Sequence, residues 1–393
     1  MSADRKLAAD IIIVGGGLAG LSLACHLLEQ GIGERRLLVL EARTEYRHDR
    51  FWCSWAQPTH PFTNCIENSW TRWRVAADGR EHVQSCDSQP YRCIPSGRLY
   101  DEALRRLAAA SNAELRLGCA VREVRDVGEA AEVEVASGEV LSASMVFDSR
   151  LQPPTATVDR DEVDWVQDFL GWHVRSEEPV FDAQTVTLMR FHASDADVRF
   201  VYVLPFSQNE ALVEATAFAP AAVADAEHEA MLHGHFSEVL GGPSYEILAT
   251  ERGRVPMSTR RRLVPAEDAR VIPIGTAGGL VKPSTGYSFE AVQRWSRAVA
   301  EDLAAGRKPT GQAPRSARAL AMDRMFLAFM RRDPARMPQL FLHMFEKVAP
   351  DVLVRFLSDR STLRDAAAVA MALPKLPMLR ESMRSLRLWV RSA

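Results

Sequence analysis

The sequence predicts an α/β protein in which a dinucleotide-binding domain is interrupted by an antiparallel sheet and followed by a helical region. Three observations predict this organisation. A strand, a glycine-rich turn and a helix follow one another over residues 10–31. Three runs of alternating apolar and polar residues lie between 184 and 218, and a strand that runs into glycines begins at residue 268. The first pattern is typical of βαβ units, and alternating runs joined by short polar links are typical of meanders.

The expected boundaries make the dinucleotide-binding domain discontinuous. The segment that ends near Asp148 and the one that begins at Asp268 each carry an apolar strand, so both are expected to return to this domain. From about Arg315 onward the chain is helical in pattern and rich in Met, Phe and Leu. The expected domains are residues 1–160 with 250–310 (of which 45–95 partly face the substrate), 161–249 for the sheet, and 311–393 for the helices.

The composition is that of a globular protein. Its 393 residues are 47% apolar and 25% charged, with a formal net charge of −3. No global basic field favours a nucleic-acid partner. The six cysteines all lie in the first third of the chain, without a CxxC pair. Reduced thiols are therefore expected rather than a disulfide framework or a zinc site, and no metal is expected.

One long uncharged run, residues 11–28, has the length of a short membrane span or a signal-peptide core. Asp10 directly precedes it, three consecutive glycines interrupt it, and His26 lies near its end. No small-residue cleavage site follows. The run is interpreted as strand, loop and helix, which predicts neither an export signal nor a transmembrane helix and favours a cytoplasmic location.

The glycine-rich turn has the spacing Gly15-x-Gly17-x-x-Gly20. In this motif the first glycine makes a tight turn, the second lets the backbone approach a pyrophosphate, and the third lets the helix pack on the strand. The helix N-terminus then directs N–H groups at phosphate. Glu41 follows Gly20 by 21 residues, at the end of the next strand, where a carboxylate binds a ribose hydroxyl. The pattern predicts a bound dinucleotide.

The choice between FAD and NAD depends on the rest of the chain. A separate nicotinamide domain would carry a second glycine fingerprint, and the sequence has none. The split architecture and the late IGTAGG favour FAD in its extended form. Taken alone, IGTAGG is also compatible with a simple strand followed by a turn.

Several segments resemble the lycopene cyclase family. Residues 274–296, IGTAGGLVKPSTGYSFEAVQRWS, resemble its C-terminal flavin-binding motif. The other segments are HDRFWCSW, YRCIPSGRLYDEAL, FLGWHVRSEEPVFDAQTVTLMRF, FVYVLPFSQNEALVEATAF and ERGRVPM. The matches run in order from Asp10 to about Trp295, roughly three quarters of the chain.

The resemblance implies an FAD-binding Rossmann-type domain, of the glutathione-reductase or p-hydroxybenzoate-hydroxylase kind, with an inserted substrate sheet. It also implies a lycopene beta-cyclase-like activity, in which reduced FAD supports closure of carotenoid ends into β-ionone rings without net redox change. The implied partners are a hydrophobic polyene, a membrane surface and an external electron donor. Many members have a second acid where this chain has Ala215, and Phe51 and Cys53 depart from the aromatic motif.

By the resemblance, the catalytic acid corresponds to Glu214. Ring closure begins with protonation of a terminal alkene, which is a very weak base. A carboxylic acid buried among apolar side chains keeps its proton at neutral pH, because desolvation raises its pKa. Strand alternation supplies that setting by placing Glu214 on one face with Leu212, Thr216 and Phe218.

Each acid also has a structural alternative. Glu214 could instead pair with Arg190 or Arg199 on the neighbouring predicted strands. Glu251, the second candidate acid, could be a salt-bridged loop residue. A developing carbocation would be stabilised by aromatic faces. The sequence offers Trp52, Trp55, Trp172, Tyr202 and Phe218.

The remaining cofactor-binding candidates are glycines and two charged residues. Only glycine lets backbone N–H groups approach an isoalloxazine or ribityl group closely. The glycines expected to do so are Gly275, Gly278, Gly279 and Gly286. Arg98, at the start of an amphipathic helix, meets a flavin phosphate or is solvated. Asp148, at the end of a strand, binds the cofactor or caps a turn.

The C-terminal segment, residues 374–393, carries five basic side chains against one acid, with Leu, Met and Trp near helical spacing. This pattern is typical of an interfacial helix and predicts peripheral membrane contact. The alternative is a terminal helix packed on its own domain.

Three other functions stay open at this point. A flavin monooxygenase or halogenase would use the same scaffold, although the halogenase motif W-x-W-x-I-P is absent. A flavin-containing protein could bind a polyene without turnover. A member of the same family could act on another terpenoid or polyene.

Overall fold

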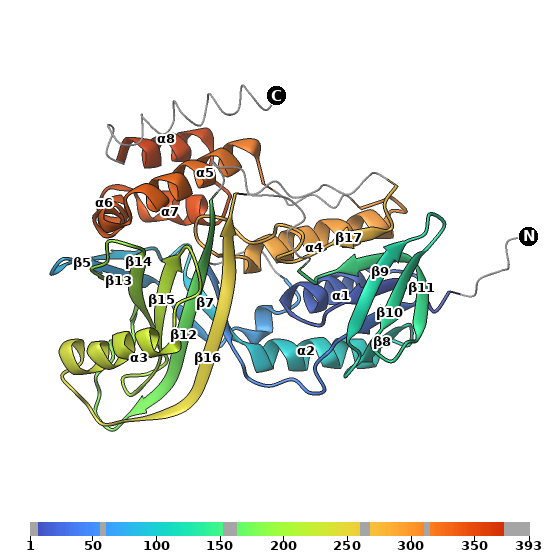
Figure 1. Cartoon of the computed structure of the whole chain (residues 1–393), viewed down its shortest axis with the longest axis horizontal. Coiled ribbons are helices and arrows are strands. Elements are labelled where there is room, and N and C mark those ends of the chain that lie inside the picture. The colour runs from blue at the N-terminus through green and yellow to red at the C-terminus, as the bar shows by residue number, and fades with distance from the viewer. Residues whose placement is uncertain (1–6, 56–59, 152–162, 260–267, 310–314, 373–393) are drawn as a thin grey trace, which may run out of the picture.

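The computed structural model describes residues 7–55, 60–151, 163–259, 268–309 and 315–372. Figure 1 shows two β-sheet regions at opposite ends of the molecule, with the C-terminal helices gathered over one of them. The predicted α/β organisation is therefore confirmed, and the two regions are considered in turn.

The first sheet is parallel at its centre, as the strand–turn–helix pattern predicted. β1 (Ala9–Val14) pairs in parallel with β2 (Leu37–Leu40) and with β11 (Val140–Asp148). Both faces of β1 and β2 are covered, which explains continuous Ile, Val and Leu in place of alternation. The sheet also contains β8 (Ala113–Arg116), β9 (Val121–Asp126), β10 (Ala131–Val135) and β17 (Val271–Pro273), in the order β8-β2-β1-β11-β10-β9 with β17 beside β11.

Two helices far apart in sequence join the halves of this domain. α1 (Leu18–Gln30) follows the glycine turn and packs with α4 (Phe289–Ala304), as well as with α2 (Ser96–Ala109). Leu21 of α1 and Trp295 of α4 belong to one buried cluster. Full burial of such a side chain contributes ~1.5–3 kcal/mol. The late segment therefore returns to the first domain as expected.

The second sheet contains the predicted meander. β13 (Thr185–His192), β14 (Val198–Pro205) and β15 (Glu210–Ala219) pair antiparallel in succession. Two long strands, β12 (Asp164–Ser176) and β16 (Tyr245–Ser258), continue the sheet beyond β15. β16 runs across residue 250, where the sequence placed the return to the first domain.

Two strands reach this sheet from the N-terminal part of the chain. β5 (Arg72–Ala77) pairs in parallel with β13, and β6 (Arg80–Ser85) forms a hairpin with β5. Asp78 and Gly79 form the turn with φ of 50° and 73°, the left-handed geometry for which Asp-Gly is preferred in two-residue hairpins. The complete order is β16-β12-β15-β14-β13-β5-β6.

A third, small sheet and one helix complete the region around the second sheet. The small sheet consists of β3 (Phe51–Trp55), β7 (Tyr91–Pro95) and β4 (Asn68–Trp70), all antiparallel. α3 (Asp225–Gly234) packs on β12 and β15 (Figure 1). One face of β12 and β15 is therefore covered by α3, and the other is left for the site.

The C-terminal part of the chain is helical over residues 315–372, as expected. Figure 1 shows these helices over the end of the second sheet. Phe341 packs on Phe191 of β13, with 5.5 Å between ring centroids. The helices are α5 (Ala317–Arg332), α6 (Met337–Lys347), α7 (Pro350–Leu357) and α8 (Leu363–Ala372).

Within the described ranges, no helix has both the length and the apolar character needed to cross a bilayer. Residues 11–28 form most of β1, the glycine turn and most of α1, as interpreted from the sequence. All six cysteines are free. The predicted interfacial segment, residues 374–393, lies outside the described residues.

Candidate active site

A cavity of about 610 Å³ lies between the first domain and the second sheet. The glycine turn before α1 and the loop between β17 and α4 line one part of it. β3, the inner faces of β12–β16 and α6 line most of the rest. The cavity therefore joins the predicted dinucleotide site to the strand that carries Glu214.

The glycine turn has the geometry that the motif requires. Gly15 has φ +95°, and a Cβ there would lie 2.1 Å from the Ser149 Oγ. A Cβ at Gly20 would lie 1.9 Å from the Gly15 carbonyl oxygen. Gly17, by contrast, has open space around its Cβ position and lies directly before α1 at the cavity. A phosphate can therefore approach the N-terminus of α1 at Gly17.

Glu41 fixes this turn. Its Oε2 accepts a hydrogen bond from the Gly16 N–H at 2.6 Å, and its Oε1 accepts one from the Arg43 N–H at 2.8 Å. Burial raises the pKa of Glu41, but the hydrogen bonds from Arg43 outweigh it, and the pKa lies below its usual value. Glu41 is therefore ionised and buried beside the turn, the position expected of a ribose-binding carboxylate.

The structure places Arg98 and Asp148 away from the cavity lining. Arg98 is half exposed and pairs with Glu67 at 2.7 Å. Asp148 is buried at the end of β11 and pairs with Arg150 at 2.8 Å. Basic side chains that do line the cavity are Arg43, Arg50 and Arg254. Sequence reasoning missed Arg43, although its place two residues after Glu41 was a usable signal.

Two of the late glycines border the cavity. Gly275 has φ +60°, and a Cβ there would lie 2.9 Å from the Ala19 Cβ. Gly286 has φ +74°, and a Cβ there would lie 1.9 Å from the Gln167 Oε1. A side chain at either position would be strained. It would also clash with α1 at Gly275 and with β12 at Gly286, so both glycines allow the loop to lie close to its neighbours beside the cavity.

Gly278 and Gly279 shape the loop instead. The Gly278 N–H donates to the Ile274 carbonyl at 3.0 Å, and the Gly279 N–H donates to the Thr276 carbonyl at 3.2 Å. A Cβ at Gly278 would lie 2.4 Å from the Pro273 carbonyl oxygen. Neither lines the cavity. Their N–H groups are thus used within the turn.

The residues present fit a flavin. The Gln167 Oε1 is buried, borders the cavity and has no hydrogen-bond partner within the described residues. An unpaired buried amide oxygen is costly, so it calls for a donor such as a flavin ring N–H. Gly17 leaves space for phosphate, and the missing side chain of Gly286 lets the loop lie directly against Gln167 at the cavity.

Glu214 lies in β15 with its carboxyl group in the cavity lining, and its side chain is 8% exposed. Burial raises its pKa to about 7, while a hydrogen bond donated by the Thr216 hydroxyl at 2.6 Å acts in the opposite direction. The predicted arginine partners are engaged elsewhere. Arg190 pairs with Glu81 at 3.4 Å, and Arg199 pairs with Asp197 at 2.9 Å.

Glu251 lies in β16 and also lines the cavity. Its Oε2 accepts a hydrogen bond from the Phe51 N–H at 3.2 Å. Burial, followed by the charge of Glu214, raises the pKa of Glu251, and the charge of Arg50 opposes this. Because the charge of Glu214 raises the pKa of Glu251, the two groups do not readily carry a negative charge at the same time. The two carboxyl groups therefore act as one buried pair.

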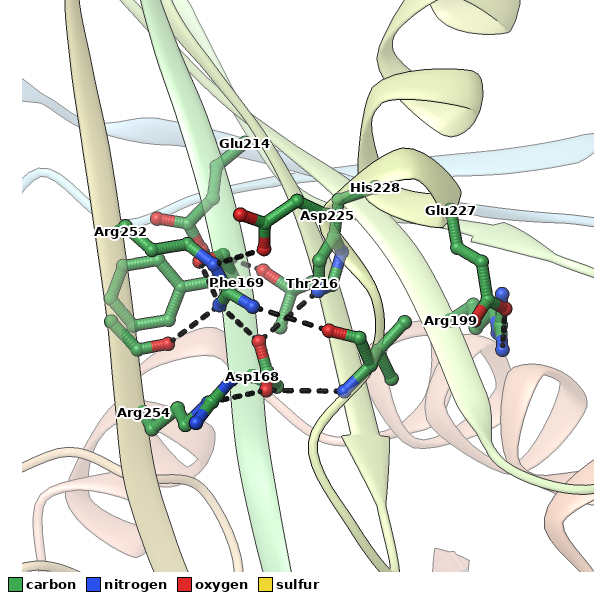
Figure 2. Close-up of polar contacts among 12 residues, drawn as sticks. Asp168, Phe169, Arg199, Glu214, Thr216, Asp225, Glu227, His228, Arg252 and Arg254 are labelled. Atoms are coloured by element: carbon green, nitrogen blue, oxygen red, sulfur yellow. Dashed lines mark hydrogen bonds and ion pairs between the residues drawn. The ribbon is translucent and has the colours of Figure 1, made fainter.

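Charged groups that stabilise these strands lie on the opposite face. Asp168 is fully buried and accepts hydrogen bonds from Arg252, from Arg254 at 2.9 Å, and from His228 of α3 at 3.2 Å (Figure 2). Because successive strand residues alternate between faces, Asp168, Arg252 and His228 are kept out of the cavity, whereas Arg254 also reaches its lining. The network ties β12, β16 and α3 together without pairing Glu214.

Aromatic side chains surround the pair. The Tyr91 hydroxyl lies 3.1 Å from the Tyr202 hydroxyl and 3.5 Å from the Tyr287 hydroxyl, and burial raises the pKa of all three. Trp55 lies 4.7 Å from the Tyr91 ring. Of the predicted aromatic residues, Trp52, Trp55, Tyr202 and Phe218 line the cavity.

Trp172 does not belong to this group. It packs on the α3 side of the sheet, 5.0 Å from the His233 ring. The expectation for Trp172 was wrong, since it is an even number of residues from Asp168 and so shares its outer face. Tyr91 and Tyr287 were not singled out from the sequence, although Tyr287 directly follows Gly286 in the recognised motif.

A buried ionic cluster anchors the cavity loop to the C-terminal helices. Lys282 is 3% exposed, and its Nζ lies 2.7 Å from both Asp323 and Asp359. The Arg315 guanidinium contacts Asp359 at 2.6 Å and donates to the Gly279 carbonyl at 2.7 Å. Sequence patterns gave no sign of this cluster, because its members come from segments far apart in the chain.

The architecture is that of FAD-binding Rossmann-type proteins. The structure is similar to p-nitrophenol 4-monooxygenase PnpA from Pseudomonas putida, with TM-score 0.62 and 17% identity, covering 90% of this chain and 98% of that one. It is also similar to HpxO of Klebsiella pneumoniae, solved with FAD and uric acid, with TM-score 0.63 and 14% identity, covering 89% and 96%. At these identities the similarity concerns the fold.

Sequence comparison specifies the family. The lycopene cyclase protein family matches residues 10–383, and the chain belongs to this family. It is 26% identical to the lycopene beta-cyclase of Pseudescherichia vulneris, over 94% of this chain and 95% of that protein. It is 24% identical to the lycopene beta-cyclase of Pantoea ananas, over 94% and 96%.

Replacing Glu214 by Gln is expected to stabilise the fold at alkaline pH. The carboxyl pKa is raised from 4.5 to about 7 on folding, so the folded state holds the proton more tightly. Stability of the native protein therefore falls as pH rises through this interval, by up to ~3 kcal/mol. The variant has no carboxyl group at this position, so its stability does not fall in this way.

Denaturant unfolding at about pH 5 and about pH 8 measures this effect. The wild type and the variant should be close at the lower pH, and the variant should be more stable at the higher pH. Glu246→Gln, on the exposed end of β16, is the control. An equal stability difference at both pH values would contradict the buried, protonated state of Glu214.

Replacing Lys282 by Met should destabilise the protein by ~3–5 kcal/mol, because the buried Asp323 would lose the cation that pairs with it, while Asp359 would keep only Arg315. Urea unfolding measures this, with the exposed Lys308→Met as the control. A cost no larger than that of the control would show that the cluster does not anchor the loop.

Proposed function

We propose that this protein closes the acyclic ends of lycopene or a related carotenoid into β-ionone rings, with no net change of redox state. The observation that supports this most directly is Glu214, a carboxyl group buried without a cationic partner among the described residues, in a cavity lined with apolar and aromatic side chains. A polyene end group offers little for most polar residues to act on, but it can accept a proton.

The reaction begins with proton transfer from the Glu214 carboxyl group to the terminal double bond. The carbon left with a positive charge is attacked by the electron pair of a nearby double bond in the same end group, which closes the ring and moves the charge into it. Loss of a ring proton to a carboxylate restores a double bond. One proton is gained and one is lost, so the mass of the substrate is unchanged.

The protein contributes to each of these steps. Tyr202 is the cross-strand neighbour of Glu214, and Trp55 and Phe218 add aromatic faces that stabilise a cation by ~0.5–2 kcal/mol each. The Glu214 carboxylate that is left after proton transfer acts in the same sense at close range. Because no water can capture the cation in a cavity filled by substrate, elimination is favoured over alcohol formation.

FAD is the proposed cofactor, held by the Gly17 turn, Glu41, Gly275 and Gly286. In its reduced form, supplied by an external electron donor, it would provide negative charge beside the developing cation. The fit of Gln167 and the glycine positions supports a flavin at this place.

The alternative is a flavin monooxygenase, which the fold of PnpA favours. It would consume oxygen and a nicotinamide cofactor with substrate and would add mass to the product. A cyclase consumes neither in proportion to product. Product mass therefore decides between the two activities. A product of unchanged mass from a different polyene would show that the substrate is another terpenoid.

Expression in a host that accumulates lycopene tests the proposal. The wild type should yield a cyclised pigment of unchanged mass, and Glu214→Gln should lower its formation by ~10²–10⁴-fold, the usual contribution of a general acid. Glu246→Gln, on the exposed end of β16, is the control and should keep activity. Chromatography and mass spectrometry of the pigments give the readout, and full activity of Glu214→Gln would refute the role of this residue.

We also propose that the protein is cytoplasmic and binds a membrane surface peripherally. A carotenoid substrate is dissolved in a bilayer, and residues 374–393 combine basic with Leu, Met and Trp side chains. Leu363 and Met371 on α8, which leads to this segment, are 72% and 71% exposed. Each basic residue near anionic lipid contributes ~1 kcal/mol.

Replacing Arg380, Arg384 and Arg387 together by Gln should therefore weaken binding to phosphatidylglycerol vesicles by roughly 100-fold. Cosedimentation of the full chain measures this, and the control replaces three exposed arginines of the first domain, Arg105, Arg122 and Arg125. Unchanged vesicle binding by the C-terminal variant would remove this segment from the proposal.

A further inference from the structure

Two cysteines lie directly opposite each other at the border of the cavity. Cys53 of β3 is paired with Cys93 of β7 in the antiparallel register of the small sheet. Residues that lie directly opposite each other project from the same face of a sheet, so the two thiols are on one side. Cys53 is partly exposed and lines the cavity, whereas Cys93 is fully buried. The two residues therefore form a pair of thiols of which one member is open to the cavity.

The backbone hydrogen bonds of this ladder determine how close the two residues lie. Pro95 has no N–H, so its pairing with Phe51 cannot be a hydrogen-bonded one. Hydrogen-bonded and non-hydrogen-bonded pairs alternate along an antiparallel ladder, so Cys53 and Cys93, two residues further on, are also a non-hydrogen-bonded pair. In agreement, the Cys93 carbonyl accepts its hydrogen bond from the other side, from the Glu67 N–H at 3.0 Å.

The type of pair places the two residues within the range of a disulfide. Residues of a non-hydrogen-bonded pair have Cα atoms about 4.5 Å apart. Disulfides span Cα distances of roughly 4.4–6.8 Å, so a bond between Cys53 and Cys93 requires no change of register. The thiols themselves are neighbours, because burial, followed by the Cys53 side chain, raises the pKa of Cys93. Cys93 is therefore a protonated thiol held beside Cys53.

We infer that Cys53 and Cys93 form a thiol modification site, at which hydrogen peroxide converts the pair into a reversible disulfide. The Cys53 sulfur first binds one peroxide oxygen, the O–O bond breaks, and a water leaves. The Cys93 sulfur then attacks the resulting sulfenic acid, and the S–S bond forms as the S–O bond breaks. The Cys93 proton leaves with this oxygen as water. Two thiols and one peroxide thus yield one disulfide and two waters.

The order of the two steps follows from burial. Oxidation of a thiol by peroxide requires access, and Cys53 lines the cavity while Cys93 does not. Cys93 has the second role, which requires only contact with the oxidised sulfur. Hydrogen peroxide is also the oxidant expected at this place, because two-electron transfer from a reduced flavin to dioxygen produces it.

The disulfide would link two strands that support the candidate active site. The Phe51 N–H of β3 donates to the Glu251 carboxyl group at 3.2 Å. The Tyr91 hydroxyl of β7 lies 3.1 Å from the Tyr202 hydroxyl. Oxidation therefore acts on the strands beside the buried acids. The inference goes beyond the proposed cyclisation and does not require it, since the thiol chemistry needs no polyene.

Mass spectrometry of the full chain tests this inference. The purified, reduced protein is treated with equimolar hydrogen peroxide, weighed intact, alkylated and digested without reductant. The treated chain should be lighter than the reduced chain by two hydrogen atoms. A linked pair of peptides that contain Cys53 and Cys93 should account for this loss, and dithiothreitol should restore both thiols.

Three variants assign the link. Cys53→Ser and Cys93→Ala should each abolish the linked peptides, and Cys93→Ala should accumulate sulfinic acid at Cys53, because no thiol is left to condense with the sulfenic acid. Cys119→Ser, which removes a partly exposed thiol elsewhere, is the control and should leave the link unchanged. The wild-type peptides decide the question even if a variant folds poorly. Free Cys53 and Cys93 in the treated wild type, or a link from Cys53 to another cysteine, overturns the inference.

Discussion

The burial of the Glu214 carboxyl group without a positive partner, among the described residues, is the constraint on which the rest of the site depends. Because folding raises its pKa from 4.5 to about 7, ionisation of this group in the folded protein costs ~3 kcal/mol more than in the unfolded chain. A protein selected only for stability would place an apolar residue there or supply an arginine. Here two arginines on neighbouring strands bind other carboxylates, Arg190 with Glu81 and Arg199 with Asp197. The cost therefore persists, and it keeps a proton available inside an apolar cavity.

The architecture separates ionised groups from this proton by using the two faces of one sheet. On the outer face, Asp168 binds Arg252 and His228 of α3, and it also binds the more exposed Arg254. The inner face presents Glu214, Glu251 and aromatic rings to the cavity. Because adjacent strand residues point to opposite faces, strong ion pairs can hold the strands together within a few ångströms of an unpaired acid. Stability and reactivity are thus assigned to different sides of the same strands.

Features that depend on local sequence were predicted well. The glycine turn, Glu41 and the meander follow from spacing and periodicity within short windows, and the place of Glu214 on an apolar inner face follows from alternation. Alternation would also have placed Trp172 outside, had it been applied to β12. The Asp78-Gly79 turn was a usable sign of the β5–β6 hairpin. The parallel pairing of β5 with β13 could not be predicted, because no local pattern shows which distant strand lies beside β5.

Features that depend on register between distant strands were beyond the sequence. The presence of Glu214 and Glu251 at one cavity requires the pairings of β12 with β15 and β16. The contact of Lys282 with Asp323 and Asp359 requires the packing of α5 and α7 against the cavity loop. Arg98 was favoured by its place at a helix start, yet Glu67 lies close enough to pair with it. In each case the local sequence is compatible with more than one contact, and tertiary packing determines which contact forms.

The central claim is that the Glu214 carboxyl group holds a proton at neutral pH while it faces an apolar cavity. Infrared difference spectroscopy of the wild type against Glu214→Gln, at pH 6 to 8 with isotopically labelled glutamate, measures this directly. The account predicts a protonated carboxyl C=O band near neutral pH that is missing from the variant and disappears as the pH rises through about 7. A carboxylate band at pH 6, with no protonated band to lose, would contradict it.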